Sequence, residues 1–146
     1  MLGALFSSSQ TGATGSPGKP LAHIDKVSIQ VIAAKDLIDA DGLGNRSDPY
    51  VKIKCGRKEK KTSVKSGTQN PTWNETYEIS TQGLFSEHDL VFELWDSDLV
   101  FDDALGSAVV PLEDLKNGPR DAWLGLQKGN KAKGKLHVII TPYGRH

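Results

Sequence analysis

Apolar residues recur at every second position in short stretches along most of the chain. The first stretch runs from residue 26 to 33, where the apolar set is Val27, Ile29, Val31 and Ala33. Because successive side chains of a strand point to opposite faces, this period of two predicts a half-buried strand. Similar stretches predict further strands at residues 50–55, 58–64, 73–79, 89–96, 104–111, 123–126 and 134–141.

The expected strands are short, and Gly, Pro, Asn and Asp residues separate them. Eight such strands without a sustained helical period predict an all-β fold, either an antiparallel sandwich or a barrel. The sequence PLEDLKNG at 111–118 adds one expected helical turn. We expect one domain at residues 23–143, between a flexible Ser/Gly-rich leader at 1–22 and a short tail at 144–146.

The single cysteine bears on the cellular compartment. Cys55 alone excludes an internal disulfide, so the expected location is the reducing cytoplasm. Cys55 alternates with Val51 and Ile53, which predicts a buried thiol rather than a nucleophile. The apolar opening MLGALF is too short for a secretory signal or a membrane span.

Charge is distributed unevenly, although the net charge is zero. Residues 52–65 are strongly basic, and residues 96–103 hold aspartates but no basic residue. A second acidic stretch, DADGLGNRSDPY at 39–50, resembles an EF-hand loop only in part. Leu43 and Tyr50 stand where an EF-hand requires oxygen ligands, so this loop is not an EF-hand.

The alternation of the 89–96 strand places its acidic residues. Asp96 and Asp98 continue the parity of the residues expected to face the core, Leu90, Phe92 and Leu94. An unpaired carboxylate is too costly in a dry core, so both must lie where the strand leaves the core. If both acidic loops open at that end, five carboxylates converge in an acidic cup, namely Asp41, Asp48, Asp96, Asp98 and Asp103.

A hard divalent cation would remove the mutual repulsion of these carboxylates. Calcium suits an irregular, loop-built oxygen site better than magnesium does, and the lack of His or Cys near the acids argues against zinc and copper. The alternative is that these are solvated aspartates that only form turns. Two loops with matching parity favour a metal site with one or two Ca²⁺ ions.

Four motifs, taken in order, resemble the C2 domain family, which binds calcium and phospholipid. They are SDPYVKIK at 47–54, NPTWNETYEI at 70–79, LWDSD at 94–98 and DDALG at 102–106. The resemblance implies an eight-stranded antiparallel β-sandwich with a C2-type Greek key, in the circularly permuted (type II) topology. It also implies that the five cup aspartates bind calcium, with backbone carbonyl ligands at Ala40 and Ser97.

Two further surfaces belong to this reading. Apolar residues at the tips of the acidic loops favour insertion among lipid headgroups; they are Leu43, Leu99, Val100 and Phe101. The alternative is that single members fold back onto the sandwich.

The resemblance also implies a basic face that binds phosphoinositides, made of Tyr50, Lys52, Lys54, Lys61 and Trp95. A solvated edge that discourages aggregation is the equal alternative for the lysines.

Together these features predict a monomeric, non-enzymatic signalling module that moves from the cytoplasm to anionic phospholipid membranes when calcium rises. A calcium-independent phosphoinositide- or protein-binding scaffold is the alternative. A metal-dependent hydrolase is disfavoured because no histidine and no Ser–His pair accompanies the acidic cup. Nucleic-acid binding is disfavoured because the net charge is zero and few aromatic residues interleave with the basic ones.

Overall fold

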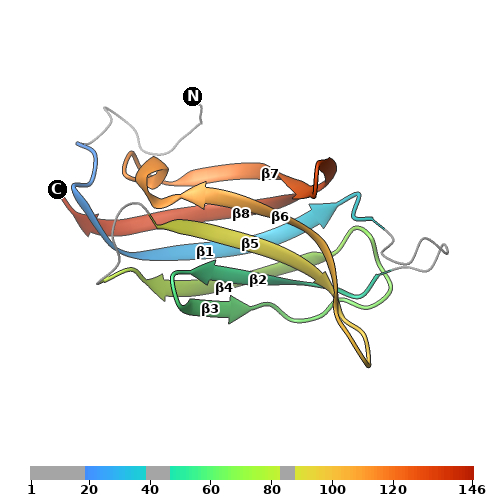
Figure 1. Ribbon diagram of the computed structural model, residues 1–146. Coiled ribbons are helices and arrows are strands. Elements are labelled where there is room, and N and C mark those ends of the chain that lie inside the picture. The colour runs from blue at the N-terminus through green and yellow to red at the C-terminus, as the bar shows by residue number, and fades with distance from the viewer. Residues whose placement is uncertain (1–18, 39–46, 83–87) are drawn as a thin grey trace.

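The computed structural model describes residues 19–38, 47–82 and 88–146. These ranges hold one short 3-10 helix, η1 (Leu112–Leu115), where the sequence predicts one helical turn. They also hold eight strands (Figure 1), namely β1 (His23–Lys35), β2 (Pro49–Cys55), β3 (Lys58–Lys61), β4 (Thr72–Ser80), β5 (Asp89–Asp96), β6 (Asp103–Pro111), β7 (Arg120–Lys128) and β8 (Lys131–Arg145).

All eight strands are antiparallel and follow the order β3-β2-β5-β6-β7-β8-β1-β4 in one sheet. One residue pair, Ser107 with Gln127, joins β6 to β7. At this weak junction the sheet divides into two layers, which confirms the predicted all-β, eight-stranded antiparallel architecture. The circularly permuted topology stays a prediction. None of the described residues belongs to a helix long and apolar enough to cross a bilayer.

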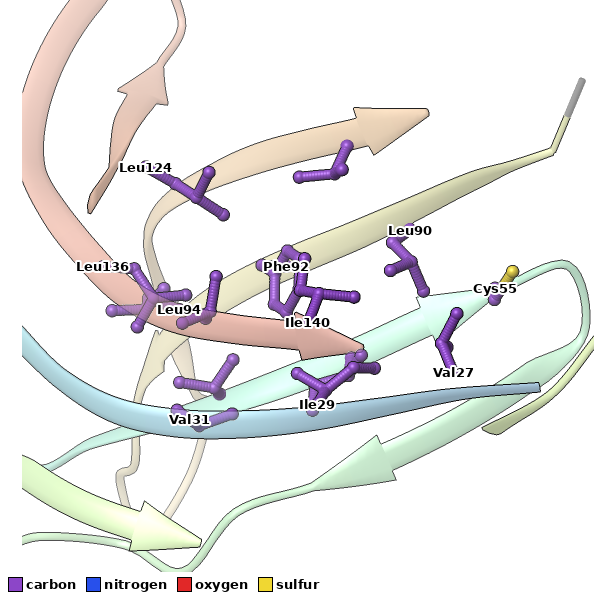
Figure 2. Close-up of a cluster of buried hydrophobic side chains, with 14 of the residues drawn as sticks. Val27, Ile29, Val31, Cys55, Leu90, Phe92, Leu94, Leu124, Leu136 and Ile140 are labelled. Carbon is purple, nitrogen blue, oxygen red and sulfur yellow. The ribbon is translucent and has the colours of Figure 1, made fainter. Parts of the chain in front are cut away.

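The core lies between the two layers. Figure 2 shows side chains of β1 and β8 meeting those of β2 and β5. Leu90, Phe92 and Leu94 have no exposed surface, as the alternation predicts. Cys55 is also buried, as predicted, and burial raises the pKa of its thiol.

The predicted parity of β1 fails at its end. The register with β8 shifts between Val31 and Ala33. Such a β-bulge adds one residue to the strand and reverses the face on which the following side chains lie. Ala34 is therefore buried while Ala33 is only half-buried, and the prediction that Ala33 continues the core-facing set is wrong.

Several strand boundaries differ from the sequence prediction, and β1 (His23–Lys35) is longer than the predicted 26–33. β3 ends at Lys61, not at residue 64. There, the backbone N–H of Val51 donates to Thr62 Oγ1 at 2.9 Å, so a side-chain hydroxyl replaces a backbone carbonyl of the ladder. β7 and β8 are longer than predicted because Lys128 pairs with Lys131 across a two-residue turn. The Gly-Asn pair of that turn, with Gly129 at φ +62°, is the overlooked signal.

The two ends of the sandwich carry different features (Figure 1). At one end, His23 at the start of β1 pairs with Arg145 at the end of β8. Arg145 lies two residues beyond the predicted end of the domain at residue 143. At the other end β1 stops, β2 starts, and the loop 97–102 joins β5 to β6. This second end holds the described part of the acidic cup.

Candidate metal-binding site

Three adjacent strands bring the described members of the acidic cup to one end of the sandwich. In the ladders, Asp96 stands opposite Pro49 of β2 on one side and opposite Asp103 of β6 on the other. Asp48 immediately precedes Pro49, and Asp98 follows Asp96 by two residues. Four of the five predicted carboxylates therefore share one pole. Ala40 and Asp41 lie outside the described residues.

Backbone hydrogen bonds fix these aspartates to one another. The N–H of Asp48 donates to Asp96 Oδ1 at 2.8 Å, and the N–H of Ser97 donates to the carbonyl of Asp48 at 2.9 Å. Asp48 Oδ1 also accepts the N–H of Gly67 at 2.6 Å. The loop after β3 thus also contacts the cup. Gly67 was not predicted from the sequence, because a backbone donor leaves no trace in a pattern of acidic side chains.

The pKa of Asp96 is affected by the neighbouring carboxylates. Burial raises its pKa above the ordinary value, and the charges of Asp48, Asp103 and Asp98 raise it further. The hydrogen bond from the N–H of Asp48 opposes this shift only in part. Asp96 is half-buried, so its negative charge is maintained at a cost that a nearby cation would remove.

The donor chemistry of the cup fits a hard divalent cation, because every described side chain of the set offers carboxylate oxygens. Among the described residues, however, no three His, Cys, Asp or Glu side chains are close enough together to bind one metal ion as they stand. Asp48, Asp96 and Asp98 each direct Oδ1 to a backbone N–H. Mutual repulsion favours this arrangement, in which each carboxylate accepts a hydrogen bond from a different backbone N–H. A bound cation would draw the carboxylates together.

An apolar tip projects beside the cup on the loop between β5 and β6. Leu99, Val100 and Phe101 are 102%, 75% and 76% exposed, respectively. None of these three side chains is packed onto the sandwich, so the alternative in which single members fold back does not hold for them. Contiguous exposed apolar residues of this kind mark surfaces that bind other molecules or membranes. Leu43, the fourth predicted member, lies outside the described residues.

The predicted basic face has internal partners. Lys52 Nζ lies 4.8 Å from the centroid of the Trp95 ring, and Lys54 forms an ion pair of 3.0 Å with Glu93. Glu93 also accepts the indole N–H of Trp95 at 3.2 Å. This glutamate was missing from the sequence prediction, although it stands opposite Lys52 in the ladder between β2 and β5. The face therefore includes a carboxylate that moderates its positive charge.

Tyr50 departs from its expected place on the basic face. Its side chain is 5% exposed, so the ring is buried rather than presented to a ligand. Its hydroxyl donates a hydrogen bond to Oδ2 of Asp102, and burial together with this bond raises the pKa of Tyr50 to about 12. Strand parity alone is a poor guide here, because the hydroxyl of Tyr50 contacts Asp102 of the neighbouring loop.

Asp102, for which the sequence predicted no role in the cup, also contacts this region. Its Oδ2 accepts the hydroxyl of Tyr50, and its Oδ1 accepts the N–H of Asp98 at 3.1 Å. The hydrogen bond from Tyr50 is the main cause that lowers the pKa of Asp102, and the charges of Lys52 and Lys61 contribute. Asp102 thus connects the acidic cup, the apolar tip and the basic face.

Comparisons with known proteins agree with this architecture. The sequence model of the C2 domain family matches residues 25–126. A C2 domain-containing protein of Arabidopsis thaliana is 39% identical over 124 residues, which cover 84% of this chain and 16% of that protein. Mouse extended synaptotagmin-3 is 34% identical over 118 residues, which cover 78% of this chain and 13% of that protein. The chain therefore spans less than a fifth of the length of these relatives.

Solved structures give the same result. A calcium-bound pair of C2 domains from extended synaptotagmin 2 superposes with a TM-score of 0.73 at 32% identity, covering 84% of this chain and 46% of that chain. A single C2 domain from a plant extended synaptotagmin 1 superposes with a TM-score of 0.71 at 29% identity, covering 88% of this chain and all of that domain.

Proposed function

Since the chain belongs to the C2 domain family, we propose that it binds anionic phospholipid membranes in a calcium-dependent manner through the acidic cup. The observation that carries this proposal is the meeting of four carboxylates at one pole, directly beside three exposed apolar side chains. We propose a non-catalytic membrane-targeting role, with residues 23–143 as the binding domain. Extended synaptotagmin 2, a structural relative, has been solved with calcium bound.

The residues proposed to hold one or two calcium ions are Asp41, Asp48, Asp96, Asp98 and Asp103, with the carbonyls of Ala40 and Ser97. A bound calcium ion supplies positive charge and open coordination positions for lipid phosphate oxygens. Without it, the carboxylates repel the anionic cytoplasmic leaflet, whose surface potential is about −30 mV. Neutralisation of the cup reverses this repulsion, and no large conformational change is required.

Once the cup is neutral, the apolar tip enters the headgroup layer. Leu99, Val100 and Phe101 expose most of their surface to water, so burial in lipid stabilises the bound state. Each side chain contributes roughly 1.5–3 kcal/mol when fully buried. The cup and the tip share the loop between β5 and β6, which makes charge neutralisation and apolar insertion parts of one binding event.

Co-sedimentation with phosphatidylserine-containing vesicles tests the proposal directly. Wild type should sediment with vesicles in calcium and return to the supernatant when EDTA is added. The double substitution Asp41→Asn with Asp96→Asn should abolish sedimentation, whereas Asp89→Asn, at the far end of β5, should have no effect. Equal sedimentation of wild type in calcium and in EDTA would contradict the proposal.

A second function is favoured by the basic face itself. Lys52 and Lys61 stand opposite each other across β2 and β3, and like charges at this spacing attract an anionic ligand. The candidate activity is calcium-independent binding of phosphoinositides or an acidic protein partner. Lys52→Ala with Lys54→Ala should weaken sedimentation with phosphoinositide vesicles in EDTA, but leave calcium-dependent sedimentation with phosphatidylserine vesicles intact.

A further inference from the structure

The hairpin that joins β7 to β8 carries only positive charge. Its residues 128–135, here called the basic hairpin, read KGNKAKGK and hold four lysines and no acidic residue. A fifth lysine, Lys35 at the end of β1, stands directly opposite Lys135 in the ladder between β1 and β8. Like charges in opposed positions destabilise a sheet, so a contribution to folding does not explain these lysines.

The charges of the five lysines are not neutralised within the fold. Among the described residues, none of them forms an ion pair with a carboxylate. The ammonium of Lys35 lies 4.8 Å from the centroid of the Trp123 ring, which holds the charge at an exposed aromatic face. Lysines can protect a free sheet edge, but β8 pairs with β7 on one side and with β1 on the other. These charges are therefore available to an external partner.

The basic hairpin lies at the same end of the sandwich as the acidic cup and the apolar tip (Figure 1). β8 starts in the hairpin and runs to the opposite end, where Arg145 pairs with His23. The hairpin belongs to the layer that contains β7, β8 and β1, whereas the apolar tip joins β5 to β6 in the other layer. Each layer thus presents one exposed element at this end, one basic and one apolar.

A lipid surface is the partner that fits this placement, because a plane that touches this end of the sandwich reaches elements of both layers. We infer that the basic hairpin and Lys35 form a second membrane contact, which binds anionic lipid headgroups while the cup and the apolar tip make the calcium-dependent contact. This inference rests on the proposed function. Two contacts from different layers hold the domain end-on to the bilayer, whereas the apolar tip alone allows it to tilt toward either layer.

The double substitution Lys128→Gln with Lys131→Gln tests the contact, because both lysines are exposed and flank the turn of the hairpin. In calcium, this variant should bind phosphatidylserine vesicles about 25-fold more weakly than wild type, since each lysine near an anionic surface contributes about fivefold. The matched control, Lys19→Gln with Lys116→Gln, makes the same change in net charge near the opposite end, where the N–H of Leu21 donates to the carbonyl of Lys116. Equal losses in the two double variants would overturn the inference.

A fluorescent label reports whether the hairpin itself reaches the bilayer. An environment-sensitive fluorophore is attached at Ala132→Cys, an exposed position of the hairpin, and in a second protein at Asn117→Cys beside η1. Cys55 is buried and does not compete for the label. Phosphatidylserine vesicles with calcium should shift the emission of the Ala132 label to the blue and leave the Asn117 label unchanged.

Two results of the labelling experiment would refute the membrane contact. One is an Ala132 label whose emission does not change although the protein sediments with the vesicles. The other is a response to soluble polyglutamate but not to vesicles, which would assign the basic hairpin to an acidic protein partner.

Repeating the sedimentation in EDTA at low ionic strength separates this inference from the proposed function. Without calcium, binding of wild type depends on its basic surfaces, so the hairpin variant should bind more weakly than the control variant. Equal binding of wild type in calcium and in EDTA contradicts the proposed function, while the comparison of the two double variants still decides the role of the hairpin. A wild type that binds in neither condition refutes both.

Discussion

The backbone N–H of Asp48 donates a 2.8 Å hydrogen bond to Oδ1 of Asp96, although the two residues are 48 positions apart in the sequence. This bond ties the start of β2 to the end of β5 at the pole where the acidic cup opens. The side chain of Asp96 is half-buried, and its charge is repelled by those of three other carboxylates. The cup consequently stores repulsion that either protonation or a cation would relieve.

The stability of the calcium-free protein should respond to this repulsion. The pKa of Asp96 is raised above 3.8, so the native state binds a proton more tightly than the unfolded chain. Stability is therefore lost as the pH rises through the raised pKa. Asp96→Asn removes the charge but keeps an acceptor for the N–H of Asp48. In EDTA at neutral pH it should raise Tm by about 2–4 °C, the shift expected for about 1 kcal/mol.

Calcium should reverse the order of stability. Ligand binding to the native state raises the Tm of wild type, whereas Asp96→Asn should gain little. Asp89→Asn changes the charge at the opposite end of β5 and should follow wild type in both conditions. Thermal unfolding followed by circular dichroism measures all three proteins, and a lower Tm of Asp96→Asn in EDTA would show that its charge is not a liability.

The apolar tip allows a matched test of insertion. Val100 and Val109 are 75% and 54% exposed, and only Val100 lies on the loop beside the cup. Val100→Ser should weaken calcium-dependent vesicle binding about tenfold, which corresponds to about 1.4 kcal/mol of lost apolar burial. Val109→Ser should not change it. Vesicle titrations of both variants measure the difference, and equal affinities would exclude insertion of this tip.

Two tyrosines should ionise late in an alkaline titration. Burial and hydrogen bonding to a carboxylate raise the pKa of Tyr50 and of Tyr77 to about 12, from the ordinary 10.0. Both groups are more easily ionised in the unfolded chain, so their contribution to stability is complete below pH 10 and is lost as the pH rises toward about 12. Phenolate absorbance should show two late groups, and Tyr50→Phe should remove one of them.

Two glycines of the β7–β8 hairpin, Gly129 in the turn and Gly134 within β8, differ in how strongly their positions require glycine. Gly134 has φ +75°, and a Cβ there would lie 2.6 Å from the carbonyl oxygen of Lys35. Gly129 has φ +62° but no atom within 4 Å of the same position. Gly129→Ala should therefore destabilise by about 1 kcal/mol from backbone strain alone, and Gly134→Ala by more. Urea unfolding compares them, and equal losses would show that the close approach is relieved without cost.

Most of the fold followed from local patterns. Alternation predicted the strands and the buried faces of Leu90, Phe92 and Leu94, because a strand exposes its side chains with a strict period of two. The same rule failed at Ala33, where the bulge in β1 depends on pairing with β8 rather than on the residue itself. Similarly, the hydroxyl of Thr62 ends β3 only because Val51 lies opposite it.

The order of residues along the chain was enough to predict where the charged side chains stand relative to the strand ends. The parity of Asp96 and Asp98 and the motifs around them were sufficient to predict an acidic cup with an apolar tip. Three contacts required the folded structure: Gly67 donates to Asp48, the ring of Tyr50 is buried, and its hydroxyl donates to Asp102. Such contacts join residues from separate loops, and their energies depend on distances that the packing of the whole sandwich sets.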